Sequence, residues 1–228
     1  MILYAIPTPL GGAAADALAP SALQTVATLK DFAVENAKSA RAFLKDAGCD
    51  VHALSIVEIK DDLQSLLQPL REGRPLGLLS EAGCPAIADP GAALVEAAHR
   101  EGFRVVPLVG PSSIVLALMA SGLQGQRFAF CGYLPREPLK LKMRIKDLEN
   151  RSTREDETEI FIETPYRNEK LMTALLAVCT SSTLLCVAED LTLPTETIRT
   201  KTVAQWRAET APVGRRPAIF LLLANPDR

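Results

Sequence analysis

Several common sequence signatures are missing from this chain of 228 residues. It has no Gly-x-x-x-x-Gly-Lys-Ser/Thr loop and no Gly-x-Gly-x-x-Gly motif after a strand, so neither ATP nor a dinucleotide is indicated as a ligand. A Gly-x-Ser-x-Gly nucleophile elbow is also absent, which argues against an α/β-hydrolase. Any bound cofactor is therefore expected to be held by backbone groups and small side chains.

The scarcity of some residue types excludes further classes of protein and kinds of site. The five cysteines form no Cys-x-x-Cys pair, and their odd number argues against a disulfide framework and favours a reducing cytoplasm. With only His52 and His99, far apart in the sequence, no metal site is expected. No apolar run reaches the ~18 residues of a membrane span, and the opening segment MILYAIPTPLGG indicates a strand and turn, not a signal peptide. A net charge of −2 argues against coating nucleic acid by bulk charge, but it allows a local basic patch.

Strand and helix patterns alternate along the chain and predict an α/β fold with a mainly parallel sheet in the first half. The predicted strands there are 2–6, 30–34, 53–57, 76–79 and 103–108, and the helices are 20–28, 39–47, 61–71 and 90–101. Gly110-Pro111 marks an expected boundary between domains 1–110 and 111–228. The second domain is predicted to contain strands 127–131, 159–163, 184–188, 196–200 and 218–223 and a helix over 168–178.

The loop after the strand 76–79 is long and rich in small residues and acids. It reads SEAGCPAIADPG, and it lies at a strand's carboxyl end, where open α/β sheets bind ligands. A simpler interpretation makes Asp89 the N-cap and Pro90 the first residue of the following helix. That interpretation does not explain the length of the loop or the presence of Glu81 beside Gly83, so ligand lining is the favoured hypothesis.

A second strand end leads through Gly110-Pro111-Ser112-Ser113 into a helix over 112–121 that is apolar on nearly every side. Such a helix is expected to be buried on several faces. The serines either cap the helix or leave its free N–H groups available to a carboxylate or phosphate. The sequence leaves these two alternatives open.

The segment FIETPYRNEK, residues 161–170, places Glu163, Tyr166 and Arg167 together after a third strand, with Asn168 as a possible cap of the next helix. A Glu163–Arg167 ion pair that braces the turn is an equally good interpretation. Residues 136–154 carry seven Lys or Arg against three acids, with Leu141, Ile145 and Leu148 at helical spacing. This pattern is typical of an amphipathic helix with a solvated face, and contact with a phosphate backbone is the alternative.

Four motifs, SEAGCPAIADPG, VVPLVGPSSIVLALMASG, RFAFCGYLP and FIETPYR, resemble in order and spacing the tetrapyrrole methylase superfamily. They are most similar to its ribosomal RNA small-subunit methyltransferase I branch. The resemblance implies two α/β domains with mainly parallel or mixed sheets, with S-adenosyl-L-methionine in the cleft between them. It also implies 2′-O-methylation of a cytidine in 16S ribosomal RNA, and a homodimer.

The resemblance, together with the chemistry and charge of the side chains, gives expected roles for individual residues. Possible catalytic bases are Glu35, Glu163 and Tyr166. The residues expected to bind the donor are Pro9, Ser80, Glu81, Ala82, Gly83, Pro85, Ala88, Asp89, Pro111, Ser112, Ser113, Tyr133, Leu134 and Pro165, with Ile114 and Leu116 beside the adenine. The residues expected to contact the RNA are Lys38, Arg41, Lys140, Lys142, Arg144 and Arg167.

Two segments depart from the branch pattern. IPTPLGGAAADAL stands where the branch has PTPIGNL followed by Asp-Ile-Thr, and Asn36-Ala37-Lys38 replaces an Asp-Thr-Arg run between Glu35 and Arg41. Two alternatives therefore remain beside the RNA methyltransferase. One is a methyltransferase of a small molecule such as a tetrapyrrole, and the other is a protein that binds the donor without turnover.

Overall fold

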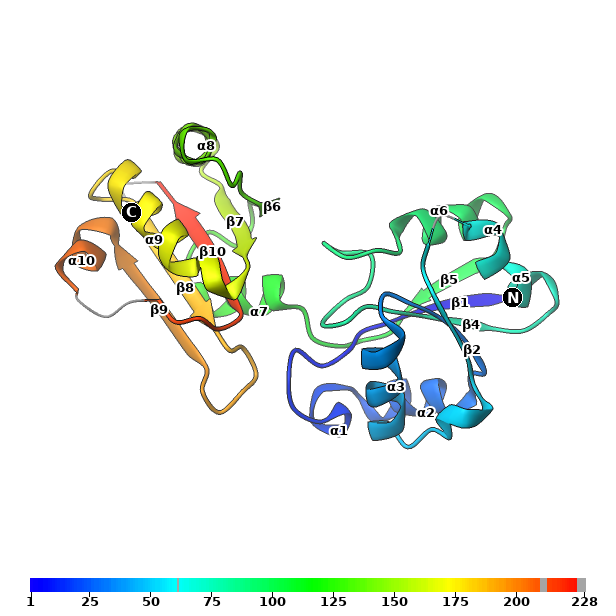
Figure 1. Cartoon of the computed structure of the whole chain (residues 1–228). Helices are drawn as coiled ribbons and strands as arrows, with labels where there is room; N and C mark the ends of the chain where they lie inside the picture. The colour runs from blue at the N-terminus through cyan, green and yellow to red at the C-terminus, as the bar shows by residue number, and fades with distance from the viewer. Residues whose placement is uncertain (61, 210–212, 225–228) are drawn as a thin grey trace. The chain divides into compact units, whose positions relative to one another are not determined.

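The computed structural model describes residues 1–60, 62–209 and 213–224. The chain divides into two compact units, Met1–Ser112 and Ser113–Arg228 (Figure 1). Each unit has its own five-stranded sheet and its own apolar core.

The sheet of unit 1 is parallel throughout. Its strands are β1 (Ile2–Ile6), β2 (Asp31–Val34), β3 (Ser55–Glu58), β4 (Leu76–Leu79) and β5 (Arg104–Pro107), and they lie in the order β3-β2-β4-β1-β5. β4 pairs with β1 and β2 on its two sides. Because all five strands point the same way, the loops that follow them emerge at one edge.

Helices cover both faces of this sheet, as the buried strands require. The helices are α1 (Ala14–Ala17), α2 (Pro20–Thr28), α3 (Ala37–Asp46), α4 (Leu63–Leu66), α5 (Gln68–Arg71) and α6 (Ala92–Arg100), with a 3₁₀ turn η1 (Val51–Ala53). Side chains of α2 and α3 form one apolar cluster with the sheet, and those of α4, α5 and α6 form another. Gly77 in β4 permits this packing, because a Cβ there would lie 2.6 Å from the Phe32 ring.

The sheet of unit 2 is mixed. It contains β6 (Phe128–Tyr133), β7 (Thr158–Glu163), β8 (Leu184–Glu189), β9 (Thr197–Thr202) and β10 (Ala218–Leu223) in the order β6-β7-β10-β8-β9. Among the described strands of this unit, only β6 and β7 pair in parallel. The surrounding elements are α7 (Ser113–Ser121), α8 (Pro138–Glu155), η2 (Pro165–Arg167), α9 (Asn168–Val178) and α10 (Val203–Ala208). The parallel sheet of unit 1 and the mixed sheet of unit 2 confirm the predicted fold class.

The main departures from the predicted elements are at helix ends. The helix predicted over 61–71 is two short helices that meet at Leu67, and residue 61 lies outside the described part of the chain. The helix predicted from Pro90 begins at Ala92, with Gly91 as its N-cap at a φ of 128°. Asp89 is therefore not the cap, because the chain turns through a left-handed glycine after Pro90.

The helix α7 is buried on one face only. Ile114, Ala117 and Leu118 are buried, whereas Val115 and Met119 are 49% and 75% exposed. The expectation of burial on several faces is therefore wrong. Among the described residues, no helix is both long enough and apolar enough to cross a membrane.

Candidate functional site

Three loops converge at the carboxyl edge of the unit 1 sheet, because β1, β4 and β2 are neighbours. The backbones of Thr8 and Gly83 exchange two hydrogen bonds of 2.9 and 3.0 Å, which joins the loop after β1 to the loop after β4. The N–H of Glu35 donates to the carbonyl oxygen of Leu79 at 3.1 Å. Backbone hydrogen bonds thus hold the carboxyl ends of all three strands together.

An open pocket of about 590 Å³ lies at this edge. Residues of the loop after β1, Thr8 to Ala13, form one wall. Ala42, Phe43 and Asp46 of α3 form another, and Glu81 and Ala82 close the site from the loop after β4. Pro9, Glu81 and Ala82, which the resemblance assigned to the donor, therefore line one pocket.

Carboxylates gather beside this pocket. Glu81 donates its backbone N–H to Glu35 Oε2 at 2.9 Å, and Glu81 Oε1 accepts from the Ser39 hydroxyl at 3.0 Å. Asp89 belongs to the same group, since Glu35 and Glu81 both act on its ionisation. No basic side chain in the described part of unit 1 forms an ion pair with any of these three acids.

Asp89 is the perturbed member of the group. Burial, first, and then the negative charges of Glu35 and Glu81 raise its pKa to about 6 from 3.8. A carboxyl group that is partly removed from water and faces other carboxylates resists ionisation. The site thus carries unneutralised negative charge near neutral pH.

Close backbone approach shapes the loop after β4. Ser80 is buried and donates its hydroxyl to the Gly83 carbonyl at 3.2 Å. Gly83 has a φ of 79°, and a Cβ there would lie 3.3 Å from Leu10. Ala86 and Ala88 also adopt positive φ, of 66° and 67°, a strained backbone that is typical of ligand sites.

The Gly110-Pro111 turn closes the same region from β5. A Cβ at Gly110 would lie 2.5 Å from the Pro7 side chain, so only glycine fits. The Cys84 thiol donates to the Pro111 carbonyl at 3.4 Å. Ser112 ends unit 1 and Ser113 begins α7. The assignment of Pro111, Ser112 and Ser113 to the donor stays a prediction.

In unit 2, the residues after β7 form a braced turn. Glu163 is buried; its Oε1 accepts from the Thr164 N–H at 2.8 Å, and its Oε2 lies 3.0 Å from the Arg167 guanidinium. The turn therefore contains the Glu163–Arg167 ion pair that the simpler interpretation of the sequence expected. Tyr166, in contrast, is 77% exposed. Glu163 has little access to a substrate, and Tyr166 has much.

Asn168 does not cap α9 as the sequence indicated. It is the first residue of the helix and fully buried, and its Nδ2 donates to the carbonyls of Gly214 and Arg216 at 3.1 and 2.7 Å. Its Oδ1 has no hydrogen-bond partner among the described residues. Long-range bonds to a distant loop take the place of the local capping bond.

The other assigned residues are distributed over both units. Lys38 and Arg41 are exposed on α3, and Arg41 donates to the Ala37 carbonyl. Pro85 is buried in the loop after β4. Tyr133 is 61% exposed at the end of β6, and Pro165 opens η2. Leu134 and Ile114 are buried, and Leu134 belongs to the unit 2 core, so its side chain packs against protein.

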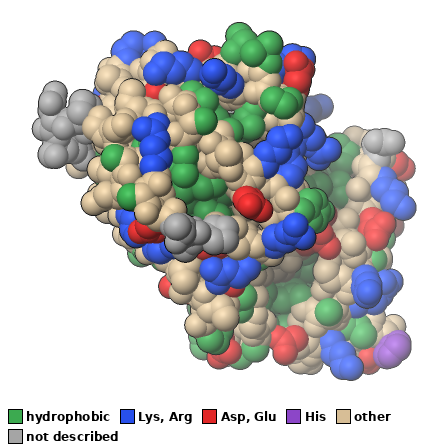
Figure 2. Space-filling view, turned by 60° about the vertical axis from the view of Figure 1, so that its left-hand side comes forward, with side chains coloured by type: hydrophobic (Ala, Val, Ile, Leu, Met, Phe, Trp, Pro, Cys, Tyr) green, Lys and Arg blue, Asp and Glu red, His purple; other side chains and the backbone are tan. Residues whose placement is uncertain are grey.

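The predicted basic helix is α8, with Leu141, Ile145 and Leu148 facing the core. Several of its cations are already paired: Lys140 with Glu137, Lys146 with Glu149 and Arg154 with Glu155. Lys142 and Arg144, and Arg136 just before the helix, have no acidic partner in the described part of the chain. Figure 2 shows Lys and Arg side chains gathered near the top of the view, on the part of unit 2 where α8 lies.

Sequence reasoning assigned no site role to most residues that line the pocket or bond to its carboxylates, among them Thr8, Ser39, Phe43 and Asp46. They have ordinary local patterns, and only the strand order brings them to the site. Thr8 alone carried a signal, because it follows a strand that the sequence predicted correctly.

The arrangement defines an α/β protein with a small-ligand pocket at the carboxyl ends of parallel strands and a second, mixed-sheet unit. The chain belongs to the tetrapyrrole (corrin/porphyrin) methylase family, whose model matches residues 13–206. This membership confirms the predicted resemblance, and with it the prediction of an S-adenosylmethionine-dependent methyltransferase.

Several similar curated proteins carry the name ribosomal RNA small subunit methyltransferase I. The protein of that name from Xylella fastidiosa is 33% identical over 211 residues, which cover 92% of this chain and 75% of the relative. The Haemophilus influenzae protein is 34% identical, covering 90% and 71%. The Escherichia coli O157:H7 protein is 32% identical, covering 86% and 67%.

Solved structures share the fold at lower identity. The methyltransferase CobJ superposes with a TM-score of 0.64 at 20% identity, covering 97% of this chain and 93% of that one. The cobalt precorrin-4 methyltransferase CbiF gives a TM-score of 0.63 at 16% identity, covering 100% and 96%. At these identities the likeness concerns the fold alone.

We predict that replacing Asp89 by Asn stabilises the protein in a pH-dependent way. The raised pKa means that the folded state holds this proton more tightly than the unfolded state, so stability falls as pH rises from about 4 through about 6. The asparagine variant avoids that loss. Its thermal midpoint should exceed the wild-type midpoint at pH ~8, and the difference should shrink towards pH ~4.

The exposed Asp16, replaced by Asn, is the matched control for the loss of one carboxylate outside the site. A constant difference between the Asp89 variant and wild type at every pH would contradict the assigned ionisation.

Proposed function

We propose that this chain transfers a methyl group from S-adenosylmethionine to a ribose 2′-oxygen of 16S ribosomal RNA. The observation that carries the proposal is the set of relatives at 32–34% identity that are named ribosomal RNA small subunit methyltransferase I. The tetrapyrrole enzymes that share the fold are only 16–21% identical. The acceptor is therefore proposed from the sequence relatives and not from the fold.

The residues at the carboxyl edge of unit 1 fit the donor. S-adenosylmethionine carries no phosphate, so a phosphate-binding loop is not needed, and it carries a sulfonium and an ammonium cation. Glu35, Glu81 and Asp89 have no basic partner in the described part of unit 1, so they can neutralise such cations. Gly83 and Gly110 allow the loops at this edge to pack closely, because a Cβ at either position would press on Leu10 or on Pro7.

The donor supplies an activated methyl group, and the chain has to orient the acceptor and remove a proton. Positioning alone supplies much of the rate in such transfers. Of the three proposed bases, Glu35 accepts one backbone N–H and Glu163 is ion-paired and buried. The Tyr166 hydroxyl is exposed, and no described residue bonds to it. Tyr166 is thus the most accessible of the three.

The unpaired cations at the start of α8 support an RNA acceptor. Arg136, Lys142 and Arg144 lie within a short stretch, and the neighbouring Lys140 is balanced by Glu137. Lys38 and Arg41 are further proposed contacts, whereas Arg167, which was also expected to contact the RNA, is paired with the buried Glu163. Phosphate contacts of this kind position a nucleic acid without reading its sequence.

Two alternatives keep the fold: methylation of a small molecule such as a tetrapyrrole, and donor binding without turnover. The altered segments around Thr8 to Ala13 and Asn36 to Lys38 are what favour them. The homodimer, the cytoplasmic location and the donor cleft between the units stay predictions.

A methyl-transfer assay separates these functions. With labelled donor, we expect transfer to 16S ribosomal RNA within small ribosomal subunits from a strain that lacks the corresponding modification, and mass mapping should locate one ribose methyl group. Transfer to a precorrin-like tetrapyrrole with none to the RNA would favour the first alternative. Donor binding with no transfer to either would favour the second.

We predict that Gly83→Val abolishes or strongly weakens binding of S-adenosylhomocysteine in a calorimetric titration, because the added side chain would enter the space beside Leu10. Gly102→Val is the matched control. Gly102 has a similar φ of 75° but open space around it, so it reproduces the backbone strain without touching the site. Equal weakening in both variants would mean that strain, and not the site, causes the effect.

We predict that replacing Arg136, Lys142 and Arg144 together by Gln flattens the salt dependence of RNA binding. For a single strand, removing one phosphate interaction should reduce the slope of log K against log salt by about 0.7. The control variant replaces Lys140, Lys146 and Arg154, which are already paired, and should change the slope much less. If the first variant keeps the wild-type salt slope of RNA binding, the unpaired cations of α8 do not contact phosphates and form a solvated surface.

A further inference from the structure

Unit 2 exposes an unusual set of aromatic rings. The chain has only eleven aromatic residues, seven Phe, three Tyr and one Trp. In the described structure, three of these rings are largely exposed: Phe128 (44%), Tyr133 (61%) and Tyr166 (77%). All three belong to β6 or to the turn directly after β7, which is its parallel neighbour.

Two of the rings share one edge of the sheet. Tyr133 is the last residue of β6, and its Cα partner is Ile162 of β7. Tyr166 lies in η2, three residues after β7 ends at Glu163, so its Cα is within about 11 Å of the Glu163 Cα. No described residue forms a hydrogen bond with either phenol or stacks on either ring. Their faces are therefore available to a ligand.

The turn that carries Tyr166 is rigid although its ring is exposed. The Arg167 guanidinium pairs with the buried Glu163, and Asn168 is tied to the loop at Gly214 and Arg216. Aromatic rings held on a rigid backbone lose little entropy when a flat ligand stacks on them. An exposed tyrosine on a floppy loop would lack this advantage.

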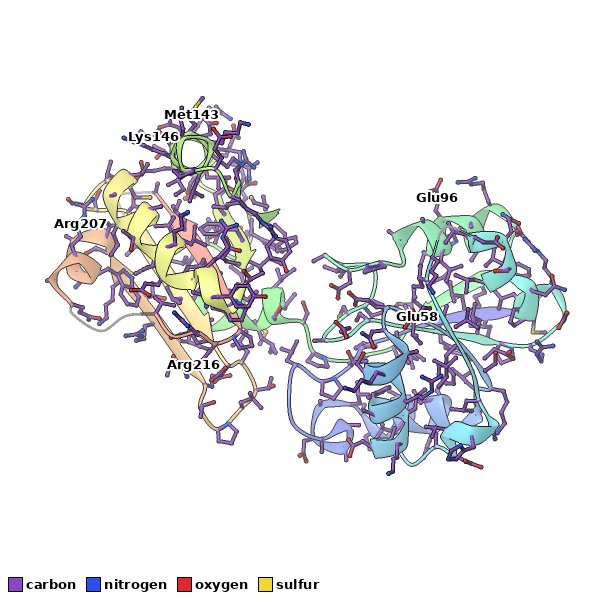
Figure 3. The ribbon with its side chains drawn as sticks, viewed as in Figure 1. Glu58, Glu96, Met143, Lys146, Arg207 and Arg216 are labelled. Carbon is purple, nitrogen blue, oxygen red and sulfur yellow. The ribbon has the colours of Figure 1, made fainter. Side chains whose placement is uncertain are left out.

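Unpaired positive charge continues from the same edge. Arg136 follows Tyr133 closely, and Lys142 and Arg144 come in the first turns of α8. Leu139 and Met143 are also exposed there, at 65% and 61%. Figure 3 shows Met143 and Lys146 on the side of α8 that points away from the sheet. Aromatic rings beside a strip of unpaired cations are the combination that binds single-stranded nucleic acid, by base stacking and by phosphate contact.

We propose that Tyr133 and Tyr166 are base-stacking positions for an unpaired stretch of the acceptor RNA, whose phosphates follow Arg136, Lys142 and Arg144. This inference rests on the proposed function and adds to it a path for the strand and a role for each ring. It also separates the two possible roles of Tyr166, since stacking needs the ring and proton removal needs the hydroxyl. Sequence-specific recognition of RNA mostly targets unpaired bases that stack on aromatic side chains, and the two exposed rings supply such positions.

The test measures binding of a short, single-stranded, mixed-sequence oligoribonucleotide by fluorescence anisotropy, without donor. Tyr133→Leu and Tyr166→Leu should each weaken binding roughly 5- to 150-fold, as expected when one base stack is removed. Tyr133→Phe and Tyr166→Phe should remain within about twofold of wild type, because the ring is kept. The salt slope should stay unchanged in all four variants, in contrast to the cation variants of α8.

Phe128→Leu is the matched control, since Phe128 is an exposed ring at the opposite end of β6. It should leave binding unchanged. A second readout uses Tyr166→Trp, whose emission should be quenched on adding the oligoribonucleotide. The other tryptophan, Trp206, is buried and should respond little.

The outcomes separate this inference from the proposed function. If wild type methylates 16S ribosomal RNA but the Leu variants bind the oligoribonucleotide normally, the stacking role is wrong and the function stands. If wild type neither binds nor methylates RNA, the function fails and the inference fails with it. If the Leu variants change the oligomeric state measured by light scattering, the rings belong to an interface between copies of the chain, which also overturns the inference.

Discussion

Unneutralised negative charge at the carboxyl edge of the parallel sheet is the constraint from which the proposed activity follows. Glu35, Glu81 and Asp89 share that edge without a basic partner in the described part of unit 1, and the pKa of Asp89 is raised by its burial and then by the two neighbouring carboxylates. The fold maintains this arrangement because β1, β4 and β2 are adjacent and because Thr8 and Gly83 exchange backbone bonds. A cationic ligand relieves the repulsion, and a methyl donor with a sulfonium centre is such a ligand.

Much of the fold could be predicted from the sequence, and the reason is burial. The strands Ile2–Ile6, Leu76–Leu79 and Ala218–Leu223 were predicted with the bounds that the structure has, because each is a short apolar run between breaking residues. Helix starts were less predictable. Asp89-Pro90 has the composition of a helix start, but α6 begins only after Gly91. No local sequence pattern predicts the positive φ of Gly91. The short helix α10 was missed although Thr202 and Gln205 form a capping box, because it spans only Val203–Ala208.

The site was predictable where it depends on strand ends and unpredictable where it depends on long-range bonds. The loop after β4 was identified because it follows an apolar strand and is too long for a plain connection. Ser39 bonds Glu81 across forty-two positions, and Asn168 bonds the loop at Gly214 and Arg216 across forty-six and forty-eight. Single-sequence patterns describe neighbours along the chain, so they assigned Asn168 a local cap. In the structure, the Asn168 side chain donates to two backbone carbonyls instead. Satisfying buried carbonyls stabilises the fold more than a cap at a helix terminus does.

Charge on α8 shows why composition alone does not define a binding surface. Its residues are rich in Lys and Arg, but Glu137, Glu149 and Glu155 already balance Lys140, Lys146 and Arg154. A cation with a carboxylate partner gains less from a phosphate than an unpaired one, since the first interaction has to be broken. The phosphate contacts should therefore concentrate on Arg136, Lys142 and Arg144, close in sequence to the exposed Tyr133. Positive charge and aromatic surface would then serve one ligand, to which the paired cations of the same helix contribute less.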